Sequence, residues 1–104
     1  KILGRNSEII NVGGEKVYPQ EVESVIQEMD NVAEIIVYSE RNSIIGDIVC
    51  AKVRLQEDED IKDFTLKLKK YCKEKLQRYK IPIKVDIVED DLHNERYKKK
   101  RNIN

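Results

Sequence analysis

The sequence predicts a small α+β domain, in which an N-terminal β-hairpin and a roughly three-stranded sheet are covered by two helices. Residues 32–38 and 48–55 are rich in β-branched side chains, and 84–88 alternates between polar and apolar positions, so each indicates a strand. Apolar residues at helical spacing indicate helices at 19–29 and 61–78. The order ββ-α-β-β-α-β within 104 residues leaves room for one domain with one modest core.

The first element is a predicted hairpin with arms at 8–11 and 15–18 and a turn at Gly13-Gly14. Glycine adopts positive φ angles without steric cost, and it lets another chain or a ligand approach the backbone closely. Arg5 and Lys16 are two cations that could meet an anionic group at this turn. A purely structural hairpin fits the same spacing.

The first helix is predicted to open at Pro19 and to run to about Met29. Proline suits the first helical turn because the N–H that it lacks would have no partner there. Acidic residues near Pro19 also suit the positive end of the helix dipole. The predicted apolar stripe consists of Val22, Val25, Ile26 and Met29, and the predicted polar face of Glu21, Glu23, Gln27 and Glu28.

The two middle strands are separated by a polar segment with Gly46 near its end, which predicts a turn across 39–47. An acidic segment then leads into the second helix, whose six lysines are expected to form a solvated face rather than a binding surface. Tyr79-Lys80-Ile81-Pro82 ends this helix. The apolar stripe predicted for it consists of Ile61, Phe64, Leu68, Tyr71, Cys72 and Leu76.

Several spaced motifs resemble the adenylate-forming enzymes, a family that includes acyl-CoA synthetases, peptide-synthetase adenylation domains and firefly-type luciferases. The run GRNSEIINVGGEKVYPQEVE (4–23) resembles the eighth core motif of this family. VAEIIVY (32–38), GDIVCAKV (46–53) and YCKEKLQRYKIPIKVDIVEDDL (71–92) resemble the family's later strands and helix, in the same order. The resemblance implies that residues 1–104 are the mobile C-terminal cap domain of a longer ligase, whose large N-terminal ATP-binding domain is absent from this chain.

The resemblance also implies a chemistry. Enzymes of this family join a carboxylic acid to ATP, with Mg²⁺ bound mainly by the large domain, and release pyrophosphate. They then pass the acyl group to the thiol of coenzyme A or of a carrier-bound phosphopantetheine. The small domain turns on a hinge between these half-reactions and presents opposite faces to the large domain. The implied function is therefore an acyl-CoA synthetase type of acid–thiol ligase or, alternatively, an adenylation domain that loads a carrier protein. The isolated domain is expected to be inactive.

Carried over residue by residue, the resemblance implies a role for each candidate position. Arg5 would lie near the nucleotide ribose and phosphate, and the Gly13-Gly14 turn would wall the pantetheine channel. Lys16 would lie close to the acyl-adenylate or the incoming thiol. The hinge position is Ser7, where the family usually has Asp or Lys.

The final motif of the family, P-x-T-x-x-G-K-[IL]-x-R, is altered in LHNERYKKKRN (92–102). His93 stands at or near the Pro position, and Tyr97 occupies the usual Gly position. Aligning the basic ending makes Lys98 the adenylation cation, whereas keeping the loop length constant makes it Lys99. We favour Lys98, because the basic ending is then retained. Three alternatives explain the same residues: a solvated basic tail, an enzyme that adenylates poorly, or a branch of the family whose partner reaction differs.

Composition limits the other function classes. Twenty basic and twenty acidic residues cancel, so no global field favours nucleic acid or an acidic membrane. No apolar stretch reaches the length of a bilayer span and no signal peptide is visible, which predicts a cytoplasmic protein without a transmembrane segment. Cys50 and Cys72 are expected to be buried free thiols, and no metal site is expected. Two alternatives lie outside the enzyme class: a domain kept for protein interaction or regulation, and nucleic-acid binding through Arg96 to Arg101 and the Lys-rich helix.

Overall fold

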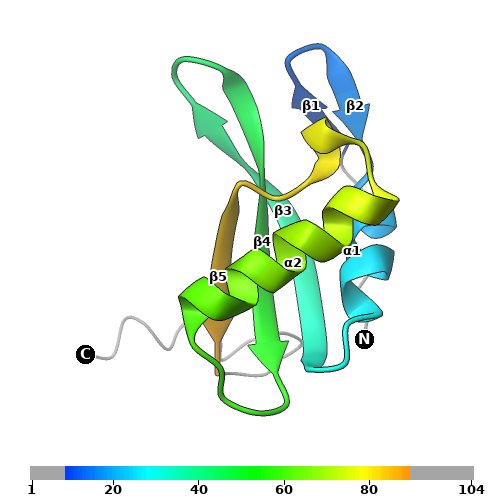
Figure 1. Cartoon of the computed structure of the whole chain (residues 1–104). Coiled ribbons are helices and arrows are strands. Elements are labelled where there is room, and N and C mark those ends of the chain that lie inside the picture. The colour runs from blue at the N-terminus through cyan, green and yellow to red at the C-terminus, as the bar shows by residue number, and fades with distance from the viewer. Residues whose placement is uncertain (1–8, 90–104) are drawn as a thin grey trace, which may run out of the picture.

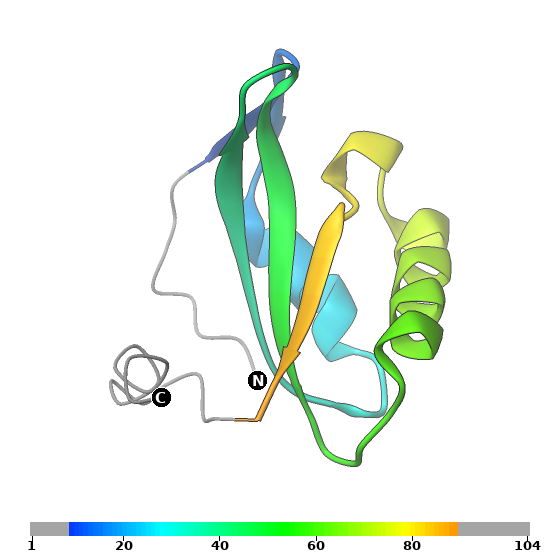
Figure 2. The ribbon, with the colours of Figure 1, turned by 90° about the vertical axis from the view of Figure 1, so that its left-hand side faces the viewer.

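In the computed structural model, which describes residues 9–89, five strands form one sheet and two α-helices lie on one of its faces (Figures 1 and 2). The predicted α+β fold class is confirmed. The elements are β1 (Ile10–Val12), β2 (Glu15–Val17), α1 (Pro19–Gln27), β3 (Val32–Asn42), β4 (Gly46–Leu55), α2 (Ile61–Lys75), the 3₁₀ helix η1 (Arg78–Lys80) and β5 (Lys84–Val88).

Strand β4 is the centre of the sheet. Along one edge it pairs antiparallel with the whole of β3. Its other edge is shared, because β1 joins it at Val12↔Gly46 while β5 runs parallel to Cys50–Arg54. The predicted hairpin and three-stranded sheet are therefore one structure, and the β1–β2 turn lies at the same end of the sheet as the β3–β4 turn (Figure 1).

The turn between β3 and β4 is much shorter than the predicted span of 39–47, because both strands continue through it and only 43–45 connect them. This end of the hairpin extends past the helices (Figure 2). Its residues therefore have no core to face and lack the alternation of apolar and polar residues that would predict a strand. The Oδ1 atom of Asn42 closes the turn by accepting from the N–H groups of Ile44 at 2.9 Å and Ile45 at 3.1 Å.

The core lies between the helices and the sheet face that they cover. Phe64, Leu68 and Cys72 of α2 are buried, so most of the predicted stripe is confirmed. Ile61 is an exception and stays exposed, since the buried positions of α2 start one turn later, at Phe64. Tyr71 is half-buried and its hydroxyl donates to Glu28 Oε1 at 2.5 Å, which joins the two helices.

Both helices end earlier than predicted. Helix α1 stops at Gln27 and α2 at Lys75, after which Leu76 is extended. The starts of the helices agree better with the prediction. Helix α1 begins at Pro19, as predicted. At the start of α2, the Asp60 carboxylate caps the helix by accepting from the backbone N–H groups of Lys62 at 3.0 Å and Asp63 at 3.2 Å.

Glu23 was predicted to lie on the polar face of α1, and this prediction is wrong: the residue is only 3% exposed. Strand β3 is an edge strand, and α1 packs against it, so position 23 faces the strand as well as the core. Glu23 Oε2 accepts from the backbone N–H of Val37 in β3 at 2.8 Å. The carboxylate thus satisfies a donor on the covered sheet edge.

Burial raises the pKa of Glu23 above its ordinary value of 4.5, and the hydrogen bond from Val37 opposes this rise only in part. The folded chain therefore binds this proton more tightly than the unfolded chain. It follows that the contribution of Glu23 to stability is fully present below its ordinary pKa and is lost as the pH rises through its raised pKa.

We expect the variant Glu23→Gln to gain stability relative to the wild type as the pH rises from about 4 to 7, because an amide cannot ionise in the buried site. Urea unfolding of both proteins across this range measures the difference. The difference should be small at the acidic end and should grow in favour of the variant. A difference that is independent of pH would contradict the assigned cause.

The prediction that Cys50 and Cys72 are buried free thiols is confirmed. Burial raises the pKa of each thiol to about 11, so neither side chain is a reactive thiolate near neutral pH. Within residues 9–89, no helix combines the length and the apolar character needed to cross a membrane.

Candidate functional site

The β1–β2 turn is built from two glycines with positive φ. Gly13 has φ +56° and Gly14 has φ +90°, which is the pattern of a two-residue type I′ turn whose twist matches the flanking strands. A Cβ atom added at either position would meet nothing within 4 Å. The conformation therefore favours glycine at both positions, while the space beside the turn is open to another surface.

Lys16 lies on β2, where it is paired with Asn11 of β1, and both residues are exposed. Its side chain forms no ion pair with an acid among residues 9–89. Val17, next in the strand, is completely buried and fixes the hairpin to the core. The hairpin thus presents a glycine edge on a firmly packed base, together with a cation that has no ion pair inside the described part of the chain.

Two other segments flank this hairpin. The β3–β4 turn lies at the same end of the sheet as the hairpin turn, and in it Ile44 is 88% and Ile45 53% exposed. Helix η1 contacts β2, and Lys80 of η1 binds the Glu21 carboxylate with N–O distances of 3.0 and 3.1 Å. The hydrogen bond to Glu21 raises the pKa of Lys80 and secures η1 against the start of α1.

The sequence analysis assigned no role to either flanking segment. A signal for the first was present, because Asn42 and Gly46 bracket the connection as a hairpin turn requires. The position of η1 depends on contacts between residues nearly 60 positions apart, which no local pattern reveals.

Arg5, Ser7, Lys98 and Lys99 lie outside the described residues, so their predicted roles stay predictions. Gly13, Gly14 and Lys16 lie together on the β1–β2 hairpin, and the roles predicted for them also stay predictions. No group of three or more His, Cys, Asp or Glu side chains is placed to hold a metal ion within 9–89.

The arrangement limits what the hairpin can do by itself. A glycine edge and a solvent-exposed ammonium can border a channel and attract an anion, because neither obstructs a narrow ligand. The hairpin itself offers no nucleophile and no buried acid–base pair. A covalent reaction at this hairpin would need reacting groups from another surface.

Comparison with known proteins identifies relatives over most of the chain. The profile of the AMP-binding enzyme C-terminal domain matches residues 21–99. A 3,4-dihydroxybenzoate–[aryl-carrier protein] ligase of Bacillus anthracis is 33% identical over 101 residues, which are 97% of this chain and 23% of that protein. The mitochondrial medium-chain acyl-CoA ligase ACSF2 of Bos taurus is 37% identical over 82 residues, which are 79% of this chain and 13% of that protein.

Solved structures of related ligases also contain a domain that matches this fold. The ATP-bound RpMatB–BxBclM chimera aligns with a TM-score of 0.79 at 35% identity, covering 89% of this chain and 19% of that one. The o-succinylbenzoate CoA synthetase of Bacillus subtilis, in complex with its acyl-adenylate intermediate, aligns with a TM-score of 0.70 at 36% identity, covering 85% and 17%. The chain thus spans less than a quarter of the length of these relatives.

Proposed function

Because this chain belongs to the family of AMP-binding enzyme C-terminal domains, we propose that it is the mobile C-terminal domain of an ATP-dependent acid–thiol ligase. The parent enzyme would form an acyl-adenylate from a carboxylic acid and ATP, with Mg²⁺, and would then transfer the acyl group to a thiol. This domain would turn between two orientations against the large N-terminal domain, one for each half-reaction.

The observation that carries this proposal is the Gly13-Gly14 turn. It projects from a hairpin whose base is buried, it has positive φ at both residues, and the space around both Cβ positions is open. Such an edge can lie against a pantetheine arm without steric obstruction, while Lys16 supplies a positive charge beside it. We therefore assign the hairpin to the face that is used for thioester formation.

The opposite orientation would bring the basic tail to the large domain. We propose Lys98 as the cation that offsets the repulsion between a carboxylate and a triphosphate, with Lys99 as the alternative. Arg5 would contact the nucleotide, and Ser7 would be the hinge. A cytoplasmic location stays a prediction, and the relative from Bos taurus is named as mitochondrial.

Two thiol acceptors are candidates, and each has support from a relative. Coenzyme A is the acceptor named for the ligase of Bos taurus and for the synthetase of Bacillus subtilis. An aryl-carrier protein is the acceptor named for the ligase of Bacillus anthracis, which matches nearly all of this chain.

The proposal is tested with the full-length ligase that contains this chain. With ATP and a panel of aliphatic and aromatic carboxylic acids, we expect acid-dependent formation of AMP and pyrophosphate. Addition of coenzyme A or a holo-carrier protein should then yield a thioester that mass spectrometry detects. Production of ADP instead of AMP would contradict the proposed chemistry.

A further inference from the structure

The cations of α2 and η1 fall into two groups that differ in their partners. In the first group, Lys67 binds Glu59, Lys75 Nζ lies 3.4 Å from Glu28 Oε1, and Lys80 binds Glu21. The second group has no acidic partner among the described residues. It consists of Lys62, Lys69, Lys70, Lys73 and Arg78, which we call the basic stripe.

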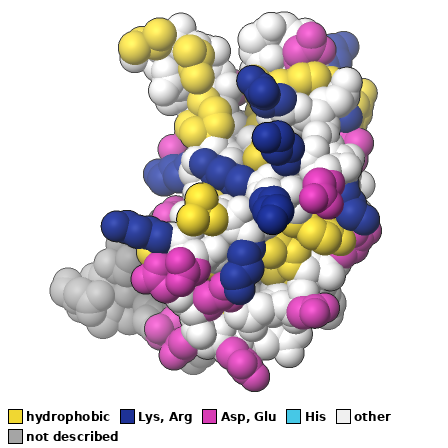
Figure 3. All heavy atoms as spheres, in the orientation of Figure 1, with side chains coloured by type: hydrophobic (Ala, Val, Ile, Leu, Met, Phe, Trp, Pro, Cys, Tyr) yellow, Lys and Arg dark blue, Asp and Glu magenta, His cyan; other side chains and the backbone are white. Residues whose placement is uncertain are grey.

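The basic stripe follows the outer surface of α2. Figure 3 shows dark blue side chains gathered on this face, over the position of α2 in Figure 1. The spacing from Lys62 to Lys69 and Lys73 is close to two and three helical turns, so these residues share one side of the helix. Leu66 lies on the same side and is 69% exposed. The surface is thus basic with an apolar side chain within it.

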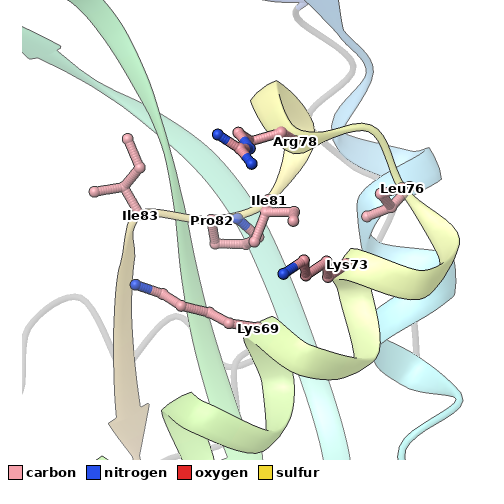
Figure 4. A pocket seen from close by; sticks show the side chains of 7 residues that line it. All are labelled: Lys69, Lys73, Leu76, Arg78, Ile81, Pro82 and Ile83. Carbon is pink, nitrogen blue, oxygen red and sulfur yellow. The ribbon is translucent and has the colours of Figure 1, made fainter.

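A cavity of about 500 Å³ lies at the C-terminal end of the basic stripe. Lys69 and Lys73 reach toward Pro82 and Ile83, and Arg78 lies on the other side of the cavity (Figure 4). The apolar part of the lining comes from Leu76, Ile81, Pro82 and Ile83. Ile83 is 54% exposed although it directly precedes β5. Three cations therefore converge on an apolar hollow.

This arrangement indicates an anionic partner. Like charges one helical turn apart, such as Lys69 and Lys73, repel each other. Neither of these two lysines forms an ion pair with an acid within residues 9–89. An acidic surface would offset the repulsion, and the two exposed apolar side chains, Leu66 and Ile83, would add contact area to it.

The extent of the surface favours a protein over a small anion. Helix α2 has 15 residues, which corresponds to a length of about 22 Å, and the basic stripe occupies most of it and continues into η1. A single phosphate group would contact only the cavity end. A negatively charged helix lying along α2 would contact the cations and both exposed apolar side chains.

We propose that the basic stripe and its cavity form the docking surface for an acidic helix of the carrier protein that receives the acyl group. This inference rests on the proposed function and selects the carrier protein between its two acceptors. Helix η1, which contributes Arg78, contacts β2 of the hairpin. A carrier protein docked here would therefore lie beside the strand that leads to the Gly13-Gly14 turn, where its pantetheine arm is needed.

The test compares two double variants of the full-length ligase that remove the same charge from the same helix. Lys69→Gln/Lys73→Gln alters the stripe, and Lys67→Gln/Lys75→Gln alters two paired lysines of the first group. With a holo aryl-carrier protein as acceptor, we expect the stripe variant to lower kcat/KM about tenfold, mainly through KM, and the paired-lysine variant to change it less than twofold. The loss should shrink as the ionic strength rises.

Two further readouts separate this inference from the proposed function. Acid-dependent pyrophosphate exchange should be unchanged in both variants, and so should kcat/KM for coenzyme A where coenzyme A is accepted. An equal loss with coenzyme A would assign the surface to a nucleotide phosphate and overturn the proposal. A wild-type ligase that does not use the carrier protein, or a stripe variant that uses it normally, would also overturn it. Absence of acyl-adenylate formation in the wild type would instead refute the proposed function.

Discussion

Replacing Gly14 with alanine in the full-length ligase is expected to slow acyl transfer to the thiol about 100-fold, while acyl-adenylate formation stays near the wild-type rate. The added methyl group would lie on the open side of the turn, where nothing stands within 4 Å. In the thioester-forming orientation we assign that space to the pantetheine arm. A displacement of about 1 Å at a reacting group is enough for a loss of this size.

Gly46→Ala is the matched control for this variant. Gly46 has φ +91°, against +90° for Gly14, and a Cβ atom there also meets nothing within 4 Å. The backbone strain of the two substitutions should therefore be alike, at about 1–2 kcal/mol. Both half-reactions are measured in each variant, by pyrophosphate exchange and by transfer from supplied acyl-adenylate. If the control loses as much transfer activity as Gly14→Ala, strain and not the channel explains the effect.

The parts of the fold that the sequence predicted well are those that local chemistry decides. Pro19 opens α1, and the positive φ angles of Gly13 and Gly14 make the hairpin turn, because each effect depends on a few neighbouring atoms. The two middle strands follow from their β-branched composition, and β5 and the stripe of α2 from periodicity, which reports one-sided burial.

The failures come from contacts between one element and the next, which the pattern within a single element does not report. Periodicity placed Glu23 on the polar face of α1, but this position meets the edge of β3, where its carboxylate accepts from Val37. The polar residues before the β3–β4 turn were not recognised as strand. The paired strands extend beyond the helices there, so no apolar face marks them. In each case the contacting residues belong to two different elements of the fold.

The candidate site divides in the same way. The glycine turn and Lys16 were predictable, since they adjoin each other in one hairpin. The basic stripe was not, because six lysines on a helix are compatible with a solvated face. Only the structure distinguishes lysines with carboxylate partners, such as Lys67, from those that converge with Arg78 on an apolar hollow.

The largest effect is expected for Lys98→Ala in the full-length ligase, which should slow acyl-adenylate formation about 100- to 1,000-fold, as when one preorganised charge donor is lost. Adenylation brings a carboxylate against a triphosphate, so a cation must stabilise the charge in the transition state. A lysine suits this role because its flexible stem carries a compact charge into a closed site.

Thioester formation from supplied acyl-adenylate should stay unchanged in Lys98→Ala, because that half-reaction uses the hairpin face. Lys99→Ala tests the alternative alignment, and Lys100→Ala is the control for simple loss of charge from the same basic run. Pyrophosphate exchange measures the first half-reaction in all three variants, and thioester yield the second. A selective loss in Lys99→Ala would move the role by one residue. An equal loss in all three would mean that the run acts only through its overall charge, and an equal loss in both half-reactions would remove Lys98 from adenylation.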